Sequence, residues 1–412
     1  MSIELLSNRV LNMAESETLA MTRIARELKE QGKDVINLSI GEPDFNTPEE
    51  IKAYAKTAIN ENWTHYPPVQ GYPDLRKAIS KKFERDNNLH YTPEQIIVST
   101  GAKQSIYQLV MAVVNEGDEV LIPSPYWVSY KEIVRVAGGI IVPIPTKIEN
   151  DFKVTPEQLK QAITPKTKLL MFSSPSNPTG MLYSKEELQA IAEVIRAYPN
   201  ILIMADEIYE HINFYGQHES IAQFDFIKEQ VVVVNGVAKG FAMTGWRIGF
   251  IGAPRYIADA CSKLQGQITS ATCSIAQRAA LKAMELDPKN SPDIINMRNT
   301  FLKRRDMVYA LLQEIEGFKV RLPQGAFYFF PDVSALYGKR VPTGAAFTQS
   351  CGKEVISNSI DLCNYLLYDA NVAVVQGVAF GDDNCIRLSY AADEAQLREA
   401  CRRIKEAIAQ LQ

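Results

Sequence analysis

The sequence is poor in the residues that build metal centres and disulfide frameworks. Its 412 residues include four histidines and six cysteines, with no Cys-x-x-Cys pair and no metal-ligand spacing between the two types. We therefore expect free thiols and no metal. No apolar run approaches the ~20 residues of a membrane span, and Met1–Glu17 has no apolar core of signal-peptide length. These absences predict a cytoplasmic protein without a membrane partner.

A strong excess of charge of either sign is also missing. The formal net charge is −4, from 44 basic and 48 acidic residues, which gives no reason to expect a nucleic acid as partner. A hydrophobic content of 46% with 22% charged residues is typical of a globular protein. Because one hydrophobic core rarely fills a chain this long, we expect two domains.

Between about residues 45 and 260, short apolar runs alternate with amphipathic helical stretches. The predicted strands are Gln95–Ser99, Glu119–Ile122, Ile140–Ile144, Leu169–Phe172, Ile201–Met204 and Val231–Val234. The predicted helices are Pro48–Asn60 behind a capping box at Thr47, Lys103–Val114, Trp127–Ala137, Thr155–Ile163, Lys185–Ala197 and Arg255–Met284. This alternation favours a mostly parallel sheet covered on both faces, with ligand sites beyond the carboxyl ends of its strands.

After about residue 285 the pattern becomes that of a smaller α+β unit. It comprises helices Ile294–Glu316 and Glu394–Leu411 and strands Phe318–Arg321, Ala326–Phe330, Val372–Val375 and Cys385–Ser389. A helix near Thr18–Glu30 is expected to pack with it, and 337–359 is interpreted as a surface loop. We predict a large domain over residues 50–300 and a small domain over residues 1–49 and 301–412, which includes an N-terminal arm.

A lysine follows the most apolar of the predicted strands. Lys239 stands just beyond Val231–Val234, and Arg247 follows eight positions later. This spacing suits a protein that holds an aldehyde cofactor covalently through an amine while binding the cofactor's phosphate nearby. A solvated surface charge is the commoner reason for a single lysine, so the interpretation depends on the rest of the chain.

A second strand ends in a carboxylate. Asp206 follows Ile201–Met204, and Tyr209 comes three residues later. A carboxylate can keep the ring nitrogen of a bound aromatic cofactor protonated, so that the ring works as an electron sink, and a tyrosine hydroxyl can reach an oxygen on that ring. The alternative is that Asp206 caps a helix N-terminus, which is common at such junctions.

Three further positions are candidates for binding anions. Thr100–Gln104 is a tight turn that could present backbone N–H groups and a helix N-terminus to a phosphate, beside Arg247. Asn177–Pro178, a candidate cis bond, could aim an amide inward, and Arg387 lies inside an apolar strand. An ordinary turn and structural ion pairs are the competing explanations.

Five segments together resemble a known family. They are Ile40–Phe45, Pro125–Tyr130, Asn177–Gly180, Asp206–His211 and Lys239–Arg247, in this order along nearly the whole chain. They resemble the class I/II aminotransferases, enzymes that use pyridoxal 5′-phosphate (PLP), and most nearly the prokaryotic-type (class Iγ) aspartate aminotransferases. The resemblance implies an α/β protein of fold-type I, in which helices flank a mostly parallel seven-stranded sheet and a smaller α+β domain is added. It also implies a homodimer with shared active sites and ping-pong amino transfer.

The resemblance assigns cofactor roles residue by residue. Lys239 would be the Schiff-base lysine and proton shuttle, Asp206 the partner of the ring nitrogen, and Tyr209 the partner of the ring oxygen. The remaining cofactor contacts would come from Trp127 stacking on the ring, from Asn177, from the phosphate ligands Ala102, Lys103 and Arg247, and from Tyr66, which would reach the partner subunit's phosphate.

Substrate binding is assigned in the same way. Asn177 and Arg387 would hold the α-carboxylate, with the backbone of Gly41 closing over it beside Trp127. The distal carboxylate would meet Lys103, assisted by Ser16, although Ser16 equally suits a plain helix N-cap.

Two departures from the family pattern bear on these roles. Gly236 and Ala238 stand where many relatives have serine, which removes hydroxyl contacts to the phosphate. The segment Lys263–Thr272 has no arginine to read an acidic side chain, so Lys103 would do this.

The predicted reaction is amino transfer from L-aspartate to 2-oxoglutarate, giving oxaloacetate and L-glutamate. The same fold with prephenate or an aromatic amino acid as substrate is the main alternative. A PLP-dependent C–S β-lyase and a non-catalytic regulator of this fold are less favoured.

Overall fold

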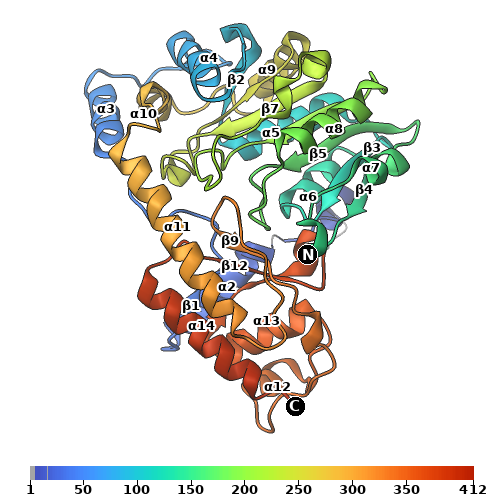
Figure 1. Cartoon of the computed structure of the whole chain (residues 1–412). Helices are drawn as coiled ribbons and strands as arrows, with labels where there is room; N and C mark the ends of the chain where they lie inside the picture. The colour runs from blue at the N-terminus through green and yellow to red at the C-terminus, as the bar shows by residue number, and fades with distance from the viewer. Residues whose placement is uncertain (1–4, 16) are drawn as a thin grey trace.

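The structure, a computed structural model, describes residues 5–15 and 17–412. Figure 1 shows a sheet region, which comprises residues 49–285, above a smaller region. The smaller region combines elements before residue 49 with residues 292–412. Its longest helix, α11 (Pro292–Gln313), starts beside the sheet region and runs down one side of the molecule.

A seven-stranded sheet with the order β2-β8-β7-β6-β5-β3-β4 lies at the centre of the sheet region. All of its strands run parallel except β8, which is antiparallel to both neighbours. The strands are β2 (Ile96–Ser99), β3 (Glu119–Ser124), β4 (Ile140–Pro145), β5 (Thr167–Ser173), β6 (Leu202–Asp206), β7 (Val231–Gly236) and β8 (Gly249–Gly252). The mostly parallel sheet is therefore confirmed. The sequence reading missed β8 because glycines at both ends leave only two apolar residues between them.

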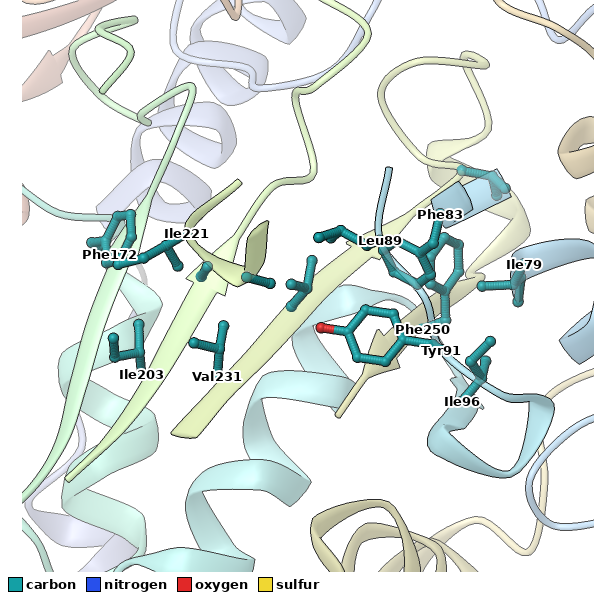
Figure 2. Packing of buried hydrophobic residues seen from close by; sticks show 14 of the residues in the cluster. Ile79, Phe83, Leu89, Tyr91, Ile96, Phe172, Ile203, Ile221, Val231 and Phe250 are labelled. Carbon is teal, nitrogen blue, oxygen red and sulfur yellow. The ribbon is translucent and has the colours of Figure 1, made fainter. Parts of the chain in front are cut away.

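Helices cover both faces of this sheet. They are α3 (Glu49–Asn60), α4 (Pro73–Asn87), α5 (Ala102–Val113), α6 (Ser129–Val136), α7 (Pro156–Ala162), α8 (Lys185–Arg196), α9 (Arg255–Ile268) and α10 (Ser274–Glu285). Alternate residues of β7 enter different clusters, so Val231 and Val233 pack on one face and Val232 and Val234 on the other. Figure 2 shows the first cluster, in which the Phe83 ring lies edge-on to Phe250 at 5.7 Å between centroids.

The smaller region has a separate core around short strands. Its elements are α1 (Asn8–Leu11), α2 (Glu17–Glu30), β1 (Ile36–Asn37), α11, β9 (Tyr328–Phe329), α12 (Ala346–Cys351), α13 (Ser359–Tyr368), β10 (Val372–Ala373), β11 (Val375–Gln376), β12 (Ile386–Ser389) and α14 (Glu394–Ala409). Strands β11, β12 and β9 form one antiparallel sheet, and β1 pairs with β10 in parallel. Met21 and Ala25 of α2 are buried in this core, which confirms the predicted packing of the N-terminal helix.

The capping box predicted at Thr47 is wrong. Helix α3 begins at Glu49 with Pro48 as its N-cap, and no side chain caps it. The Thr47 hydroxyl instead donates a 2.8 Å hydrogen bond to the carbonyl oxygen of Ala242. A tertiary contact 195 residues away therefore replaced the local one, and it ties this segment to the loop that follows β7.

Three other expectations need correction. The single helix expected over Arg255–Met284 is two helices, because the polar segment 269–273 ends α9 and Ser270 adopts a left-handed backbone. Phe318–Arg321 forms only an isolated bridge through Lys319, and the predicted loop 337–359 contains α12.

The six cysteines, all within the described residues, are free thiols as expected. Of the helices in residues 5–15 and 17–412, none combines the length and hydropathy needed to traverse a bilayer.

Candidate active site

A cavity of about 610 Å³ lies at the carboxyl ends of the parallel strands. Its wall and floor include residues at or beyond the ends of five strands, among them Lys103 after β2, Trp127 after β3, Asn177 after β5, Asp206 at the end of β6 and Lys239 after β7. The smaller region supplies the opposite wall through Gly41, Tyr328 and Arg387. The size suits a small organic molecule, and polar groups of both charges converge on it.

Lys239 extends into this cavity from the loop after β7. Its Nζ donates a 2.5 Å hydrogen bond to the carbonyl oxygen of Gly41. Loss of hydration lowers the pKa of Lys239 to about 8, and the positive charges of Arg387 and Arg247 act in the same direction, while Glu42 opposes them. A substantial fraction of this amine is therefore neutral near pH 8, which is the nucleophilic form.

Asp206 is buried at the floor of the cavity. Its Oδ2 accepts a 2.8 Å hydrogen bond from Tyr130 Oη, and its Oδ1 accepts one of 3.2 Å from the backbone N–H of Ile208. Burial raises the pKa of Asp206 to about 6, although the Tyr130 hydrogen bond and Lys239 work against the shift. The bond to Ile208 resembles the capping role considered as the alternative, and the carboxylate lines the cavity at the same time.

Tyr209 and Tyr328 join the two walls of the cavity. Their hydroxyl groups are 2.7 Å apart, and both side chains are buried. The Tyr328 ring also lies 4.6 Å from the guanidinium carbon of Arg387, within cation–π range. Burial raises the pKa of Tyr209 well above its ordinary value, so its hydroxyl stays protonated and can donate a hydrogen bond.

Arg387 is almost completely buried on β12, and its hydrogen-bond partners are neutral. Nη1 donates to Asn177 Oδ1 at 3.0 Å, and Nη2 donates to the carbonyl oxygen of Ser39 at 2.5 Å. Its Nε has no hydrogen-bond partner, and within residues 5–15 and 17–412 no carboxylate forms an ion pair with Arg387. The structural ion pair considered from the sequence is therefore wrong. A buried guanidinium without an anion is suited to bind one.

Arg247, Lys103 and the start of α5 form a positive corner of the cavity. Gly101 has a φ of +80°, and a Cβ there would lie 2.4 Å from Arg247 Nη2, so glycine permits the arginine to approach the helix N-terminus. Lys103 Nζ lies 4.9 Å from the centre of the Trp127 ring. Partial burial and the charge of Arg247 lower the pKa of Lys103. Together with Ala102, whose backbone begins α5, these residues offer donors for a dianion.

Gly236 and Ala238, the two positions at which many relatives have serine, differ in their structural surroundings. A Cβ at Gly236 would lie 2.8 Å from the carbonyl oxygen of Ile248, so the close approach of β7 to β8 leaves no room for a serine there. Ala238 lines the cavity, so at this position a hydroxyl is absent from the wall.

One predicted residue, Tyr66, does not line this cavity. Tyr66 is 95% exposed and borders a separate surface hollow with Trp63, His65 and Thr272. Ser16 lies outside the described residues. The residues missed from the sequence include Tyr130, Tyr328 and Ser39. Tyr130 stands within the Pro125–Tyr130 segment and could have been found there, whereas no local signal marks the other two.

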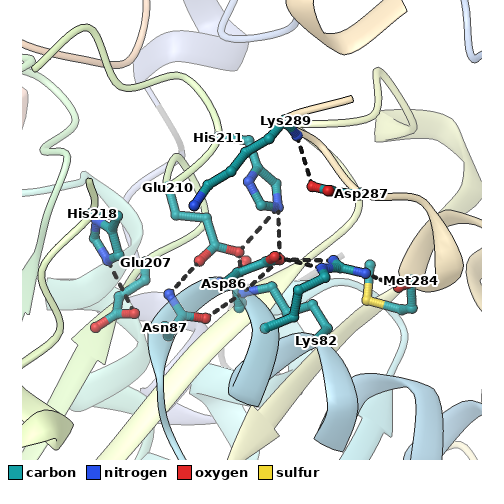
Figure 3. Close-up of polar contacts among 12 residues, drawn as sticks. Lys82, Asp86, Asn87, Glu207, Glu210, His211, His218, Met284, Asp287 and Lys289 are labelled. Atoms are coloured by element: carbon teal, nitrogen blue, oxygen red, sulfur yellow. Dashed lines mark hydrogen bonds and ion pairs between the residues drawn. The ribbon is translucent and has the colours of Figure 1, made fainter. Parts of the chain in front are cut away.

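A buried ionic cluster surrounds Glu210, the residue that follows Tyr209 in the chain (Figure 3). The carboxylate of Glu210 forms an ion pair with Lys82 Nζ. It also accepts a 2.8 Å hydrogen bond from Asn87 Nδ2 and lies 3.2 Å from His211 Nε2. Burial favours protonation of Glu210, but the charge of Lys82 outweighs it and leaves the pKa of Glu210 well below its usual range. The cluster therefore anchors the strand end that carries Asp206 and Tyr209.

This cluster also gathers carboxylates and imidazoles at distances that could suit a metal. Ligand atoms of Glu207, Glu210 and His218 lie within 4.8 Å of one another, a grouping that sequence spacing did not predict. Lys82 already supplies the positive charge that a metal ion would bring to Glu210. The arrangement therefore fits a structural ion-pair network.

The chain matches the family described as aminotransferase class I and II over residues 33–404. It is 46% identical to the Petunia hybrida bifunctional aspartate aminotransferase and glutamate/aspartate-prephenate aminotransferase, covering 98% of this chain and 82% of that protein. The aspartate aminotransferase from Rhizobium meliloti has a TM-score of 0.93 at 40% identity, covering 99% of both chains. The Thermus thermophilus aspartate aminotransferase with maleate has a TM-score of 0.90 at 39% identity, covering 98% of this chain and 99% of that one.

The chain belongs to the class I and II aminotransferase family. The resemblance drawn from five segments is thereby confirmed, as is the fold-type I architecture that it implied. The cavity between the sheet and the smaller region is therefore the candidate active site. It contains a partly neutral amine, a buried carboxylate and an arginine without an anion.

Proposed function

We propose that this aminotransferase binds PLP in the described cavity and transfers the amino group of L-aspartate to 2-oxoglutarate, giving oxaloacetate and L-glutamate. The observation that carries the proposal is the convergence of Lys239, Asp206, Tyr209 and Arg387 on one cavity from three separate segments, which are the loop after β7, the end of β6 and β12. The names of the relatives from Petunia hybrida and Rhizobium meliloti support aspartate as substrate.

The residues present fit PLP. The positive corner of Arg247, Lys103 and the α5 N-terminus suits its phosphate, and the absence of a side chain at Gly101 opens the approach. Asp206 would pair with the ring nitrogen, Tyr209 would donate to the ring oxygen, Trp127 would stack on the ring and Asn177 would lie beside it. When bound, PLP supplies an electron sink that stabilises negative charge left at the substrate Cα.

The chain's own groups would perform the remaining tasks. Lys239, with a pKa of about 8, can attach the cofactor and, once released, can remove and return the proton at Cα. Arg387 and Asn177 would fix the α-carboxylate under the backbone of Gly41, which orients the Cα bond to be broken. Both tasks require only side chains that already line the cavity.

Lys103 is proposed to read the distal carboxylate of aspartate or glutamate. Its amine lies at the cavity wall over Trp127, and Lys263–Thr272 supplies no arginine for this role. The Thermus thermophilus structure with maleate, a dicarboxylate, supports a site for two carboxyl groups. Ser16 would assist, as the sequence suggested.

We further propose a homodimer in which the exposed Tyr66 reaches the partner subunit's phosphate. We also propose two domains, residues 50–300 against residues 1–49 and 301–412, that close over the substrate. The Lys239–Gly41 hydrogen bond across the cavity supports such closure.

Steady-state assays with purified protein and added PLP test the proposal. Oxaloacetate formed from L-aspartate and 2-oxoglutarate would be followed with a coupled dehydrogenase. Prephenate and an aromatic amino acid are run in parallel, since the Petunia hybrida relative's name includes prephenate. Faster turnover of either would replace aspartate as the principal substrate. Pyruvate released from cystathionine would indicate a β-lyase.

A further inference from the structure

The hydrogen bond between Tyr130 and Asp206 is the feature of the cavity that family resemblance left without a role. Tyr130 lies in α6, is 0% exposed, and donates from Oη to Asp206 Oδ2 at 2.8 Å. The other carboxylate oxygen accepts the backbone N–H of Ile208. Each oxygen of Asp206 therefore has one fixed donor, and each keeps a further lone pair for another.

Tyr130 is itself held in place. Its ring meets the Trp127 ring edge-on, with 5.5 Å between centroids and 90° between planes. Burial, together with the negative charge of Asp206, raises the pKa of Tyr130 well above its ordinary value, so the hydroxyl remains a donor. The Tyr130 hydroxyl is therefore held in place as a donor to the carboxylate at the floor of the cavity.

We propose that Tyr130 is a positioning residue, which keeps the Asp206 carboxylate ionised and oriented toward the ring nitrogen of PLP. This inference rests on the proposed function. A buried carboxylate loses hydration, and a charge-assisted hydrogen bond is the main compensation available to it. Burial and the charge of Glu207 disfavour the ionised form of Asp206, whereas the hydrogen bonds from Tyr130 and Ile208 and the charge of Lys239 favour it. Tyr130 provides the largest of these favourable contributions.

Loss of the Tyr130 hydroxyl should raise the pKa of Asp206, because this hydrogen bond stabilises the ionised carboxylate. Burial raises the pKa of Asp206 to about 6 even with the Tyr130 hydroxyl in place. Removing that hydroxyl raises the pKa of Asp206 further, so that near neutral pH more of the carboxyl is protonated. The cost to the folded protein is then largest above pH 6, where Asp206 would otherwise be ionised, and is smallest near pH 5.

The first test compares Tyr130→Phe with the wild-type holoenzyme in kcat/KM for aspartate across pH. We expect a loss of about tenfold at neutral pH, the net value of one hydrogen bond to a charged group. The low-pH limb of the profile should move to higher pH. Tyr365→Phe is the matched control, because that hydroxyl donates to the carbonyl oxygen of Ala407 far from the cavity. A Tyr130→Phe profile that superimposes on wild type overturns the inference.

The second readout does not need activity. Denaturant unfolding of the full chain without added cofactor is measured at pH 5 and pH 8 for wild type, Tyr130→Phe, Asp206→Asn and the double variant. We expect the effect of Tyr130→Phe to be larger at pH 8 and to fall several-fold in the Asp206→Asn background. An effect equal at both pH values and in both backgrounds would show a packing role only. If wild type bound no PLP, the proposed function would fail, while this cycle would still report the Tyr130–Asp206 link.

Discussion

The side-chain amine of Lys239 donates a hydrogen bond to the carbonyl oxygen of Gly41, at 2.5 Å and across 198 residues of sequence. Lys239 belongs to the loop after β7, and Gly41 follows β1 of the smaller region. The two walls of the cavity are therefore linked through the residue proposed to carry the chemistry. Any change that engages this amine also frees the carbonyl oxygen of Gly41, which couples the lysine to the substrate side of the site.

Lys239→Ala should abolish turnover and leave the fold intact. The variant loses both the covalent attachment point and the proton carrier, and each of these raises the turnover rate by several orders of magnitude. We therefore expect a loss of at least about 10⁴-fold in kcat. Rates with aspartate and 2-oxoglutarate are measured beside a far-UV circular dichroism spectrum. Activity within tenfold of wild type, in a folded variant, would exclude Lys239 from its role.

The capture of PLP by the cofactor-free protein should depend on pH through the Lys239 amine. Only the neutral amine attacks an aldehyde, and the pKa of Lys239 is lowered to about 8. The capture rate, followed by absorbance in stopped flow, should rise with pH to a midpoint near 8. A midpoint near the ordinary lysine value of about 10.5 would show that the cavity does not tune this amine.

Arg387→Lys should reduce kcat/KM for aspartate by about 100-fold although the charge is kept. Lysine has no planar fork, so it cannot bind a carboxylate through two parallel bonds while contacting Asn177. Arg305→Lys, which changes a buried arginine outside the cavity, is the control for stability alone. Equal losses in both variants would assign Arg387 a structural role.

Lys103→Ala should act mainly through substrate choice. If Lys103 reads the distal carboxylate, KM for aspartate should rise about tenfold while KM for alanine changes little. A matched loss for the two substrates, together with weaker PLP binding, would leave Lys103 with the phosphate contact alone and would contradict its role toward the distal carboxylate. Both constants come from the same assay, with the affinity for PLP measured by titration.

Lys82→Met should destabilise the protein by about 3–5 kcal/mol, because it leaves the Glu210 carboxylate buried without its counter-charge. The double variant Lys82→Met with Glu210→Gln should recover part of this loss, since no unpaired charge then remains. Denaturant unfolding at neutral pH measures both. If the single variant lost less than 1 kcal/mol, the ionic cluster would not anchor the strand end that carries Asp206.

Much of the sheet region could be predicted from sequence because its strands are short, apolar and separated by helices with clear periodicity. Lys239, Asp206 and Asn177 each follow such a strand, so parallel topology alone places them at one edge. The cavity confirms that they meet there.

What the sequence did not reveal depends on tertiary contacts. β8 has too few apolar residues for a pattern, and Thr47 bonds to Ala242 instead of capping α3. Tyr328 lies on β9, which pairs with β12 in the smaller region, and it meets Tyr209 only because that sheet faces the end of β6 across the cavity. This relationship has no local signature in the sequence. Likewise, Arg387 resembles a structural ion pair until the neutral nature of its partners is seen.

The absorbance spectrum of the PLP-loaded protein, recorded before and after addition of L-aspartate alone, tests the central claim most directly. We predict that the band of the lysine-bound cofactor falls and that the band of pyridoxamine phosphate rises, since half of the reaction needs no second substrate. A spectrum that does not respond to aspartate but responds to an aromatic amino acid would contradict the assigned substrate. Failure to form any cofactor band with PLP in excess would contradict the proposed function as a whole.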